Sequence, residues 1–216
     1  MKTTFLLYAA LLLGFESLYA HPTSSQGTIS LMGETSEDLS HYDISYSARY
    51  WLSFGVRYHE QRKPLEVSEA ALGTLGVLLY RSNGEGHQGN IYAMAGAGHG
   101  WIKDQNNTTI DEDFVYSHGL QADYETRKIY TLAKYENLKS RDSVLSEYYQ
   151  LRVGFAPYVV GFYDLNTWFI LQTSQDKALS ESIEITPILR FFYKNVLTEV
   201  GASVDGKFMF NFMVHY

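Results

Sequence analysis

The stretch KFMFNFMVHY, residues 207–216, alternates between aromatic or branched side chains and a second set that includes Lys, Asn and His. Successive side chains of a β-strand point to opposite faces. One face would carry Phe208, Phe210, Phe212, Val214 and Tyr216, and the other Lys207, Met209, Asn211, Met213 and His215. A tilted strand of about 9 to 11 residues crosses a membrane, and this stretch has ten. It therefore predicts a strand with one aromatic face.

The same period of two recurs in HYDISYSARY (residues 41–50) and WLSFGVRYHE (residues 51–60). Alternation alone fits two folds, because an aromatic face can pack in the core of a soluble sandwich or against lipid around a polar lumen. Two features favour the barrel. The polar faces mix Gly, Ser, Arg and Glu, as a narrow lumen would. The aromatic strand also runs to residue 216, whereas the ends of soluble domains more often fray as polar tails.

We therefore expect an all-β, up-and-down antiparallel transmembrane barrel of about twelve strands, with ten as the alternative count. The predicted strands are Gly27–Glu34, His41–Tyr50, Trp51–Gln61, Ala70–Arg81, Gly89–Lys103, Asp113–Thr126, Arg127–Asn137, Ser146–Val160, Asp164–Thr173, Glu181–Tyr193, Lys194–Asp205 and Gly206–Tyr216.

The predicted connections differ between the two ends of the barrel. Those after odd-numbered strands carry the polar insertions TSEDLS, RKPLEVSE, DQNNTTIDE, LKSRDS and SQDKALSE. Most of those after even-numbered strands are tight, at Tyr50-Trp51, Thr126-Arg127 and Tyr193-Lys194. RSNGEGHQG is long for the tight side, and SVDGK is short for the other. Short turns at one end and longer loops at the other are typical of outer-membrane barrels, whose short turns are periplasmic.

Composition narrows the class of protein further. The 216 residues have the size of one domain, and 45% apolar with 15% aromatic residues exclude a disordered chain. A net charge of −7 argues against a nucleic-acid binder. The absence of Cys from the sequence excludes disulfides, thiolate metal sites and a Cys nucleophile. A mean hydropathy of −0.20 argues against a helical membrane bundle.

The first residues have the pattern of a secretory signal peptide. Lys2 supplies the positive charge, Phe5–Phe15 forms the apolar stretch, and Leu18-Tyr19-Ala20 ends on a small residue. The apolar stretch has eleven residues, too few to span a bilayer, which takes about 20. We expect residues 1–20 to be cleaved and residues 21–216 to form the barrel in the outer membrane.

Several stretches resemble known proteins. The last strand, with Gly206 ahead of its alternating Phe residues and an aromatic end, resembles the C-terminal signal of Gram-negative outer-membrane barrels. QADYETRKIY, ESIEITPILRFFYKN, LTEVGASVDGK and FNFMVHY resemble stretches of small proteobacterial outer-membrane proteins of no established activity. The resemblance covers about the C-terminal half and implies fold and location, with lipid, lipopolysaccharide and the barrel-insertion machinery as partners. It implies no catalytic residue and no cofactor, and it does not identify any further protein partner.

Placing the polar faces inward puts charges of both signs in the lumen. The candidate lumen residues are Asp43, Arg49, Arg57, His59, Asp123, Glu125, Lys134, Glu136, Arg152, Glu184, Arg190 and Glu199. Cross-strand pairs such as Asp43 with Arg57, or Arg190 with Glu199, would seal a filled interior, whereas a charged constriction would select small solutes or ions. A barrel of this size can be filled or open. We expect a narrow passive channel, with a sealed structural or partner-binding barrel as the alternative.

A surface enzyme and a metal site are the remaining hypotheses. Ser117 and His118 fall on opposite faces of a strand, so they cannot form a dyad without a bulge. The acidic run 111–113 offers a carboxylate for a His, but no catalytic motif is present. His99 and His118 flank one loop and would face each other as weak metal candidates if the hairpin were symmetric. Interfacial positions explain both more simply, and the sequence predicts neither an enzyme nor a metal.

Overall fold

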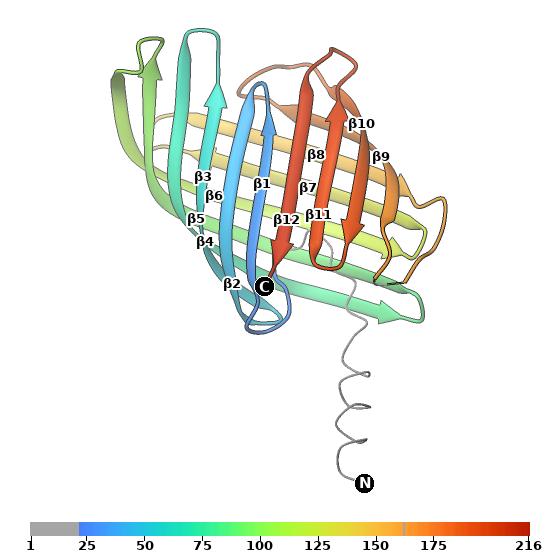
Figure 1. The fold of residues 1–216 in the computed structure, drawn as a ribbon. Coiled ribbons are helices and arrows are strands. Elements are labelled where there is room, and N and C mark those ends of the chain that lie inside the picture. The colour runs from blue at the N-terminus through green and yellow to red at the C-terminus, as the bar shows by residue number, and fades with distance from the viewer. Residues whose placement is uncertain (1–21, 162) are drawn as a thin grey trace.

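The structure is a computed structural model that describes residues 22–161 and 163–216. The predicted signal peptide, residues 1–20, lies outside the described residues. The described residues form twelve strands, which close into one antiparallel barrel (Figure 1). The strands are β1 (Ile29–Ser36), β2 (Leu39–Arg49), β3 (Leu52–Arg62), β4 (Glu66–Gly84), β5 (His87–Asp104), β6 (Thr109–Thr126), β7 (Ile129–Lys139), β8 (Val144–Phe155), β9 (Asn166–Asp176), β10 (Glu184–Tyr193), β11 (Val196–Ala202) and β12 (Phe208–His215). Among these residues no helix is long and apolar enough to cross a membrane.

Each strand pairs with its neighbours in sequence, and β1 pairs with β12 to close the ring. The closing pair is in register from Ser30 opposite His215 to Ser36 opposite Met209. The Ser30 hydroxyl and His215 Nδ1 lie 2.7 Å apart on the inner face of this seam. Closure leaves no unpaired strand edge, and the predicted twelve-strand, up-and-down barrel is confirmed.

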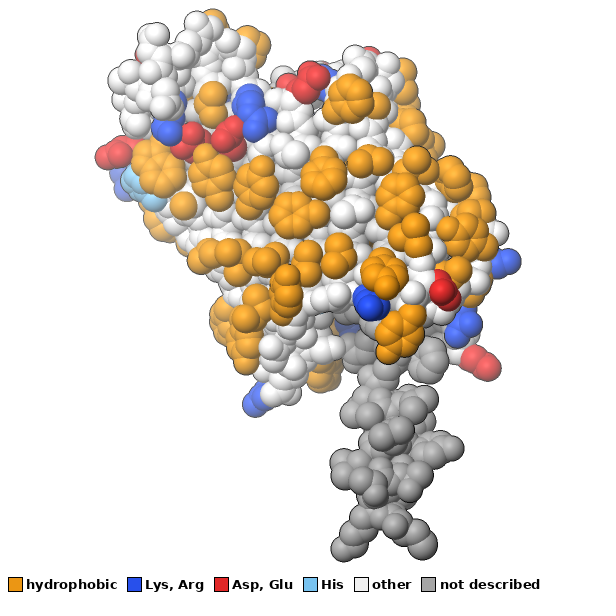
Figure 2. Space-filling model, viewed as in Figure 1, with side chains coloured by type: hydrophobic (Ala, Val, Ile, Leu, Met, Phe, Trp, Pro, Cys, Tyr) orange, Lys and Arg blue, Asp and Glu red, His pale blue; other side chains and the backbone are white. Residues whose placement is uncertain are grey.

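The two faces of the strands separate as the alternation predicts. On β3, Phe54 and Val56 are 50% and 59% exposed, whereas Ser53, which precedes Phe54 and faces inward, is 3% exposed. Figure 2 shows hydrophobic side chains spread over the visible outer face. Exposed apolar surface on this scale needs lipid or a partner to cover it, and it matches the outward apolar band of outer-membrane barrels.

The connections between strands fall into two groups at the two ends of the barrel. We call the end that carries the connections after odd-numbered strands the loop end. The end that carries the connections after even-numbered strands is the turn end. At the turn end, RSNGEGHQG is mostly strand, since β4 runs to Gly84 and β5 begins at His87. Gly86, at φ 77°, permits the tight turn between them. At the loop end, the polar stretches after β1 and β5 are also largely strand.

The longest break between strands lies at the turn end, contrary to the predicted asymmetry. The sequence predicts a strand to Val160, but β8 ends at Phe155 and β9 begins at Asn166. Pro157 lacks the backbone N–H that a continued ladder would need. The predicted strand end at Val160 is therefore wrong, and the β8–β9 connection joins the exceptions to the tight turns at this end.

Candidate functional site: the charged lumen

Eleven of the twelve candidate lumen residues lie on inward faces, in register with other inward residues. The buried ones are Asp43, Asp123, Glu125, Arg152, Arg190 and Glu199, and the half-buried ones are Arg57, His59, Lys134, Glu136 and Glu184. Glu184 lies near the loop end, at the first residue of β10. The twelfth, Arg49, is exposed.

A bulge accounts for Arg49. The β2–β3 register shifts between Ser47 and Arg49, so that Arg49 pairs with Leu52 while Ser47 pairs with Ser53. Cross-strand partners share a face of the sheet. An extra residue in one strand turns the following side chains to the other face. The prediction that Arg49 lies in the lumen is therefore wrong.

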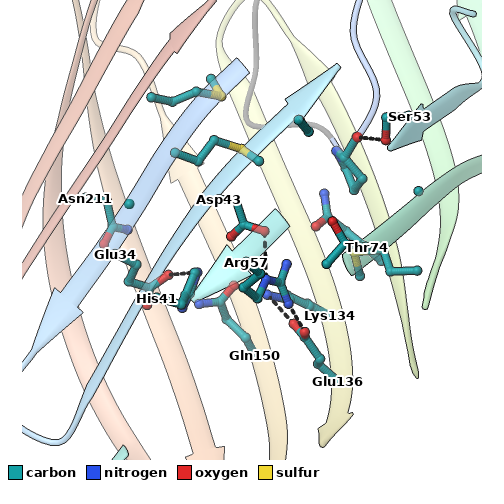
Figure 3. Close-up of a pocket in the computed structure, with 18 of the residues that line it drawn as sticks. Glu34, His41, Asp43, Ser53, Arg57, Thr74, Lys134, Glu136, Gln150 and Asn211 are labelled. Atoms are coloured by element: carbon teal, nitrogen blue, oxygen red, sulfur yellow. Dashed lines mark hydrogen bonds and ion pairs between the residues drawn. The ribbon is translucent and has the colours of Figure 1, made fainter. Parts of the chain in front are cut away.

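The first charge cluster centres on Arg57, and Figure 3 shows it reaching across the lumen. Its Nε donates a hydrogen bond to Asp43 Oδ1 at 2.7 Å, which confirms the predicted cross-strand pair. Its Nη1 also donates to Glu136 Oε1, from β7. Lys134 Nζ lies 2.9 Å from the other Glu136 oxygen. Two acids and two bases thus alternate in one network, with β3 and β7 joined through the interior.

The second cluster centres on Glu199 and is more deeply buried. Arg190 Nε donates to Glu199 Oε1 at 2.6 Å, which confirms the other predicted pair. Arg152 Nη1 donates to Oε2 at 3.1 Å, and Asn211 Nδ2 to the same oxygen at 2.7 Å. The Arg190 guanidinium also lies 4.3 Å from the centre of the Tyr130 ring. Such a group is destabilised by loss of one partner, because the charge left behind is buried.

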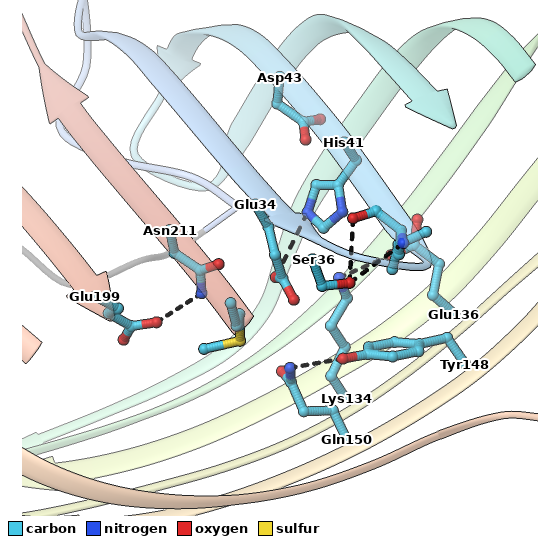
Figure 4. Close-up of polar contacts among 12 residues, drawn as sticks. Glu34, Ser36, His41, Asp43, Lys134, Glu136, Tyr148, Gln150, Glu199 and Asn211 are labelled. Atoms are coloured by element: carbon cyan, nitrogen blue, oxygen red, sulfur yellow. Dashed lines mark hydrogen bonds and ion pairs between the residues drawn. The ribbon is translucent and has the colours of Figure 1, made fainter. Parts of the chain in front are cut away.

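A third group adds two residues, Glu34 and His41, that were not among the candidate lumen residues. Glu34 is the cross-strand partner of His41, which in turn is opposite His59. The Glu34 carboxylate and His41 Nε2 are 3.8 Å apart (Figure 4). Register between β1, β2 and β3 brings these side chains into one row. Glu34 is the last residue of the first predicted strand. Its cross-strand pairing with His41 is the feature that could have identified it as a lumen residue.

These clusters border a cavity of about 150 Å³ inside the barrel. Its charged lining residues are Glu34, Asp43, Arg57, Lys134, Glu136, Arg152 and Glu199, four acids and three bases. Ser53, Thr74 and Gly76 line it as well, and their side chains are small. A polar cavity of this size holds several waters. Between the cavity and the loop end, Gln61 Nε2 donates a hydrogen bond to Asp176 Oδ2 at 2.9 Å. Side chains from β3 and β9 therefore also meet there.

The weak metal candidates do not come together. His99 is opposite Phe114, whereas His118 is opposite Ala95, four positions further along the hairpin. The facing arrangement is therefore wrong, because the turn is not centred between the two. His99 Nε2 lies 3.6 Å from Glu112 at the surface. No group of three or more potential His or acidic ligands occurs in the described ranges.

The strand geometry also separates the two residues of the possible Ser117–His118 dyad. Ser117 is buried on the inward face of β6, and His118 is exposed on the outward face. The two side chains therefore lie on opposite sides of the sheet. Asp113 accepts hydrogen bonds from the backbone N–H groups of Phe114 and Arg141, so it has a structural role at the surface.

No family model matches the chain, and no curated protein matches it. Among solved structures, the chain is similar to "KdgM porin in complex with disordered oligogalacturonate", with TM-score 0.47, 14% identity, and 88% of this chain and 98% of that one covered. "KdgM porin" alone matches with TM-score 0.46, 15% identity and the same coverage. OmpTdeltaL8, a loop deletion mutant of OmpT, "an outer membrane protein of Vibrio cholerae", matches with TM-score 0.34, 9% identity, and 88% and 97% covered.

Proposed function

We propose that the protein is a bacterial outer-membrane barrel that acts as a narrow passive channel for ions and small solutes. The observation that carries the proposal is the polar cavity, lined by charges of both signs, inside a closed barrel with an apolar exterior. Charged side chains at a constriction can set the selectivity of a pore. The cavity of about 150 Å³ favours ions and water-sized solutes over bulky ones.

The charge balance supports only weak selectivity. Arg57 and Lys134 face Glu136 in one cluster, and Arg152 and Arg190 face Glu199 in the other. A passing ion would therefore meet both signs at close range. We infer a small conductance with little preference between cations and anions.

The same proposal includes location and assembly. The exposed apolar residues of the outer face would contact lipid and lipopolysaccharide. The outward Phe208 and Phe210 of β12, both exposed, would be available to the barrel-insertion machinery. Recovery with outer membranes, and a heat-dependent shift of the folded protein on gels, test this part.

A sealed barrel is the second candidate, and one observation favours it. Arg190 and Glu199 have side chains that are 1% and 2% exposed, and they fill the interior beside Arg152. A barrel in which such pairs close every path would be structural or would bind a partner at its surface.

Conductance of the purified, refolded protein in a planar bilayer decides between the two. The channel predicts discrete single-channel steps that depend on salt concentration. Detergent without protein, and protein kept in urea, are the controls. A silent bilayer from protein whose folding is shown by the gel shift would contradict the channel and support the sealed barrel.

A further inference from the structure

The segment before the first strand turns into the barrel. Residues 22–26 precede β1, and Pro22 lines the lumen cavity. Thr23 is 1% exposed. A polar residue outside the strands is rarely so deeply buried, since such segments usually run over the protein surface.

Specific hydrogen bonds hold the segment against β2 and β3 at the turn end. The Ser53 hydroxyl donates to the Pro22 carbonyl at 2.6 Å, and Figure 3 shows this contact inside the barrel. The Ser24 backbone N–H donates to the Ser47 hydroxyl oxygen at 2.9 Å. The Thr23 hydroxyl donates to the carbonyl of Tyr50 at 3.1 Å. Two inward serines and one turn carbonyl thus form a seat for three consecutive residues.

A glycine beside Ser53, its cross-strand partner Gly76, also borders the seat. A Cβ placed on Gly76 of β4 would lie 3.2 Å from the Pro22 carbonyl oxygen and 3.5 Å from Pro22 Cβ. The same Cβ would lie 2.6 Å from the Ser53 hydroxyl that holds the segment. A larger residue at this position would therefore compete with the segment for its space.

The backbone turns at Gly27, between the buried segment and β1. This residue has φ 89°, in the left-handed region that residues with a Cβ rarely adopt. Its N–H donates to the Ser47 carbonyl at 2.8 Å. No atom lies within 4 Å of a Cβ added at Gly27, so its role is conformational rather than steric.

We propose that residues 22–26 form an internal plug, which narrows the turn end of the lumen and limits conductance while it is seated. The inference rests on the proposed channel function. The four contacts described above are all between neutral groups, and none is an ion pair. Such a seat can release the segment without leaving a buried charge unpaired.

Two kinds of variant release the plug by different routes. Ser47→Ala with Ser53→Ala removes the side-chain seat, and Gly27→Ala disfavours the inward turn. Ser68→Ala is the control for the serines, because Ser68 is also buried but lies near the loop end of β4. Gly206→Ala is the control for the glycine, since Gly206 has φ 88° and also has open space around its Cβ.

Two measurements are made on each protein. The first is single-channel conductance. The second is the rate at which a thiol reagent labels Thr23→Cys, which would be the sole thiol because the sequence has no Cys. Loss of about two hydrogen bonds is expected to speed labelling on the order of tenfold. Conductance is expected to rise in both release variants and to stay unchanged in both controls.

The outcomes separate this inference from the proposed function. Faster labelling with higher conductance, in the release variants only, supports the plug. A conducting wild type whose conductance and labelling do not change in the release variants overturns the plug and leaves the channel standing. If every protein is folded and silent, the channel and the gating role both fail, and labelling then shows only whether the segment is seated.

Discussion

The side-chain amide of Gln61 and the carboxylate of Asp176 form a 2.9 Å hydrogen bond across the lumen, from β3 to β9. These strands are six places apart in a ring of twelve, so the contact joins opposite walls. The Ser146 hydroxyl donates to the same Asp176 oxygen at 2.6 Å, and Gln61 is fully buried. In the proposed channel, a solute would have to pass beside this bridge near the loop end.

Gln61→Ala is therefore expected to raise single-channel conductance. Asp176 keeps its bond from Ser146, so the loss of stability should stay near that of one hydrogen bond, about 0.5–1.5 kcal/mol. Gln175→Ala is the matched control, because Gln175 lies beside Asp176 in sequence and bonds to the Glu181 carbonyl at the surface. Equal conductance in the two variants would show that the bridge does not limit the path.

Arg152→Ser should shift ion selectivity towards cations. The cavity lining loses one of its three bases and keeps its four acids. Glu199 retains Arg190 and Asn211, so unfolding in urea should show a loss of about 1–3 kcal/mol. Reversal potentials in a salt gradient measure the selectivity. A larger stability loss, with no current in either protein, would instead indicate a sealed interior.

Phe54→Arg tests the outward face. Phe54 is half exposed on β3, and an Arg facing lipid near the bilayer midplane costs about 2–4 kcal/mol. Ser45→Arg, at the cross-strand partner of Gly55 and on the inward face of β2, should cost less because its charge meets the polar lumen. Refolding into lipid across a urea series measures both. The reverse order would mean that the inside and outside assignments are exchanged.

Lys207 links two loop-end connections by donating a hydrogen bond to Asp38. This bond with the Asp38 carboxylate raises the pKa of Lys207 above its usual range. A raised pKa in the folded state adds stability at pH values below the unfolded pKa of about 10.4. That stability is lost as the pH rises through the folded pKa.

Lys207→Met should therefore lower stability at pH 8 by about 0.2–1 kcal/mol, the usual value for an exposed pair. The difference between wild type and variant should shrink as the pH rises above about 10.4. Urea unfolding of both proteins at pH 8 and at a pH above about 10.4 provides the comparison. A difference that is the same at both would show that the effect of Lys207 is packing rather than charge.

The sequence alone predicted the barrel, a count of about twelve strands with ten as the alternative, and most of the inward and outward faces. Alternation with a period of two sets the face of each side chain. In an up-and-down barrel each strand pairs with its neighbours in sequence, so the order of the strands sets which strands pair. For that reason the pairs Asp43 with Arg57 and Arg190 with Glu199 could be predicted without a structure. The expected export and cleavage of residues 1–20 stay predictions.

Which side chains meet across the lumen depends on the tertiary structure. Arg57 and Glu136 are 79 residues apart, and Gln61 and Asp176 are 115 apart. Such contacts depend on the stagger between strands and the shape of the closed ring, which no local pattern encodes. The bulge turns Arg49 outward although the alternating pattern of residue types continues through this position, so the sequence pattern does not reveal it. The inward turn of residues 22–26 likewise depends on the left-handed backbone of Gly27 together with hydroxyls that β2 and β3 bring to the same place.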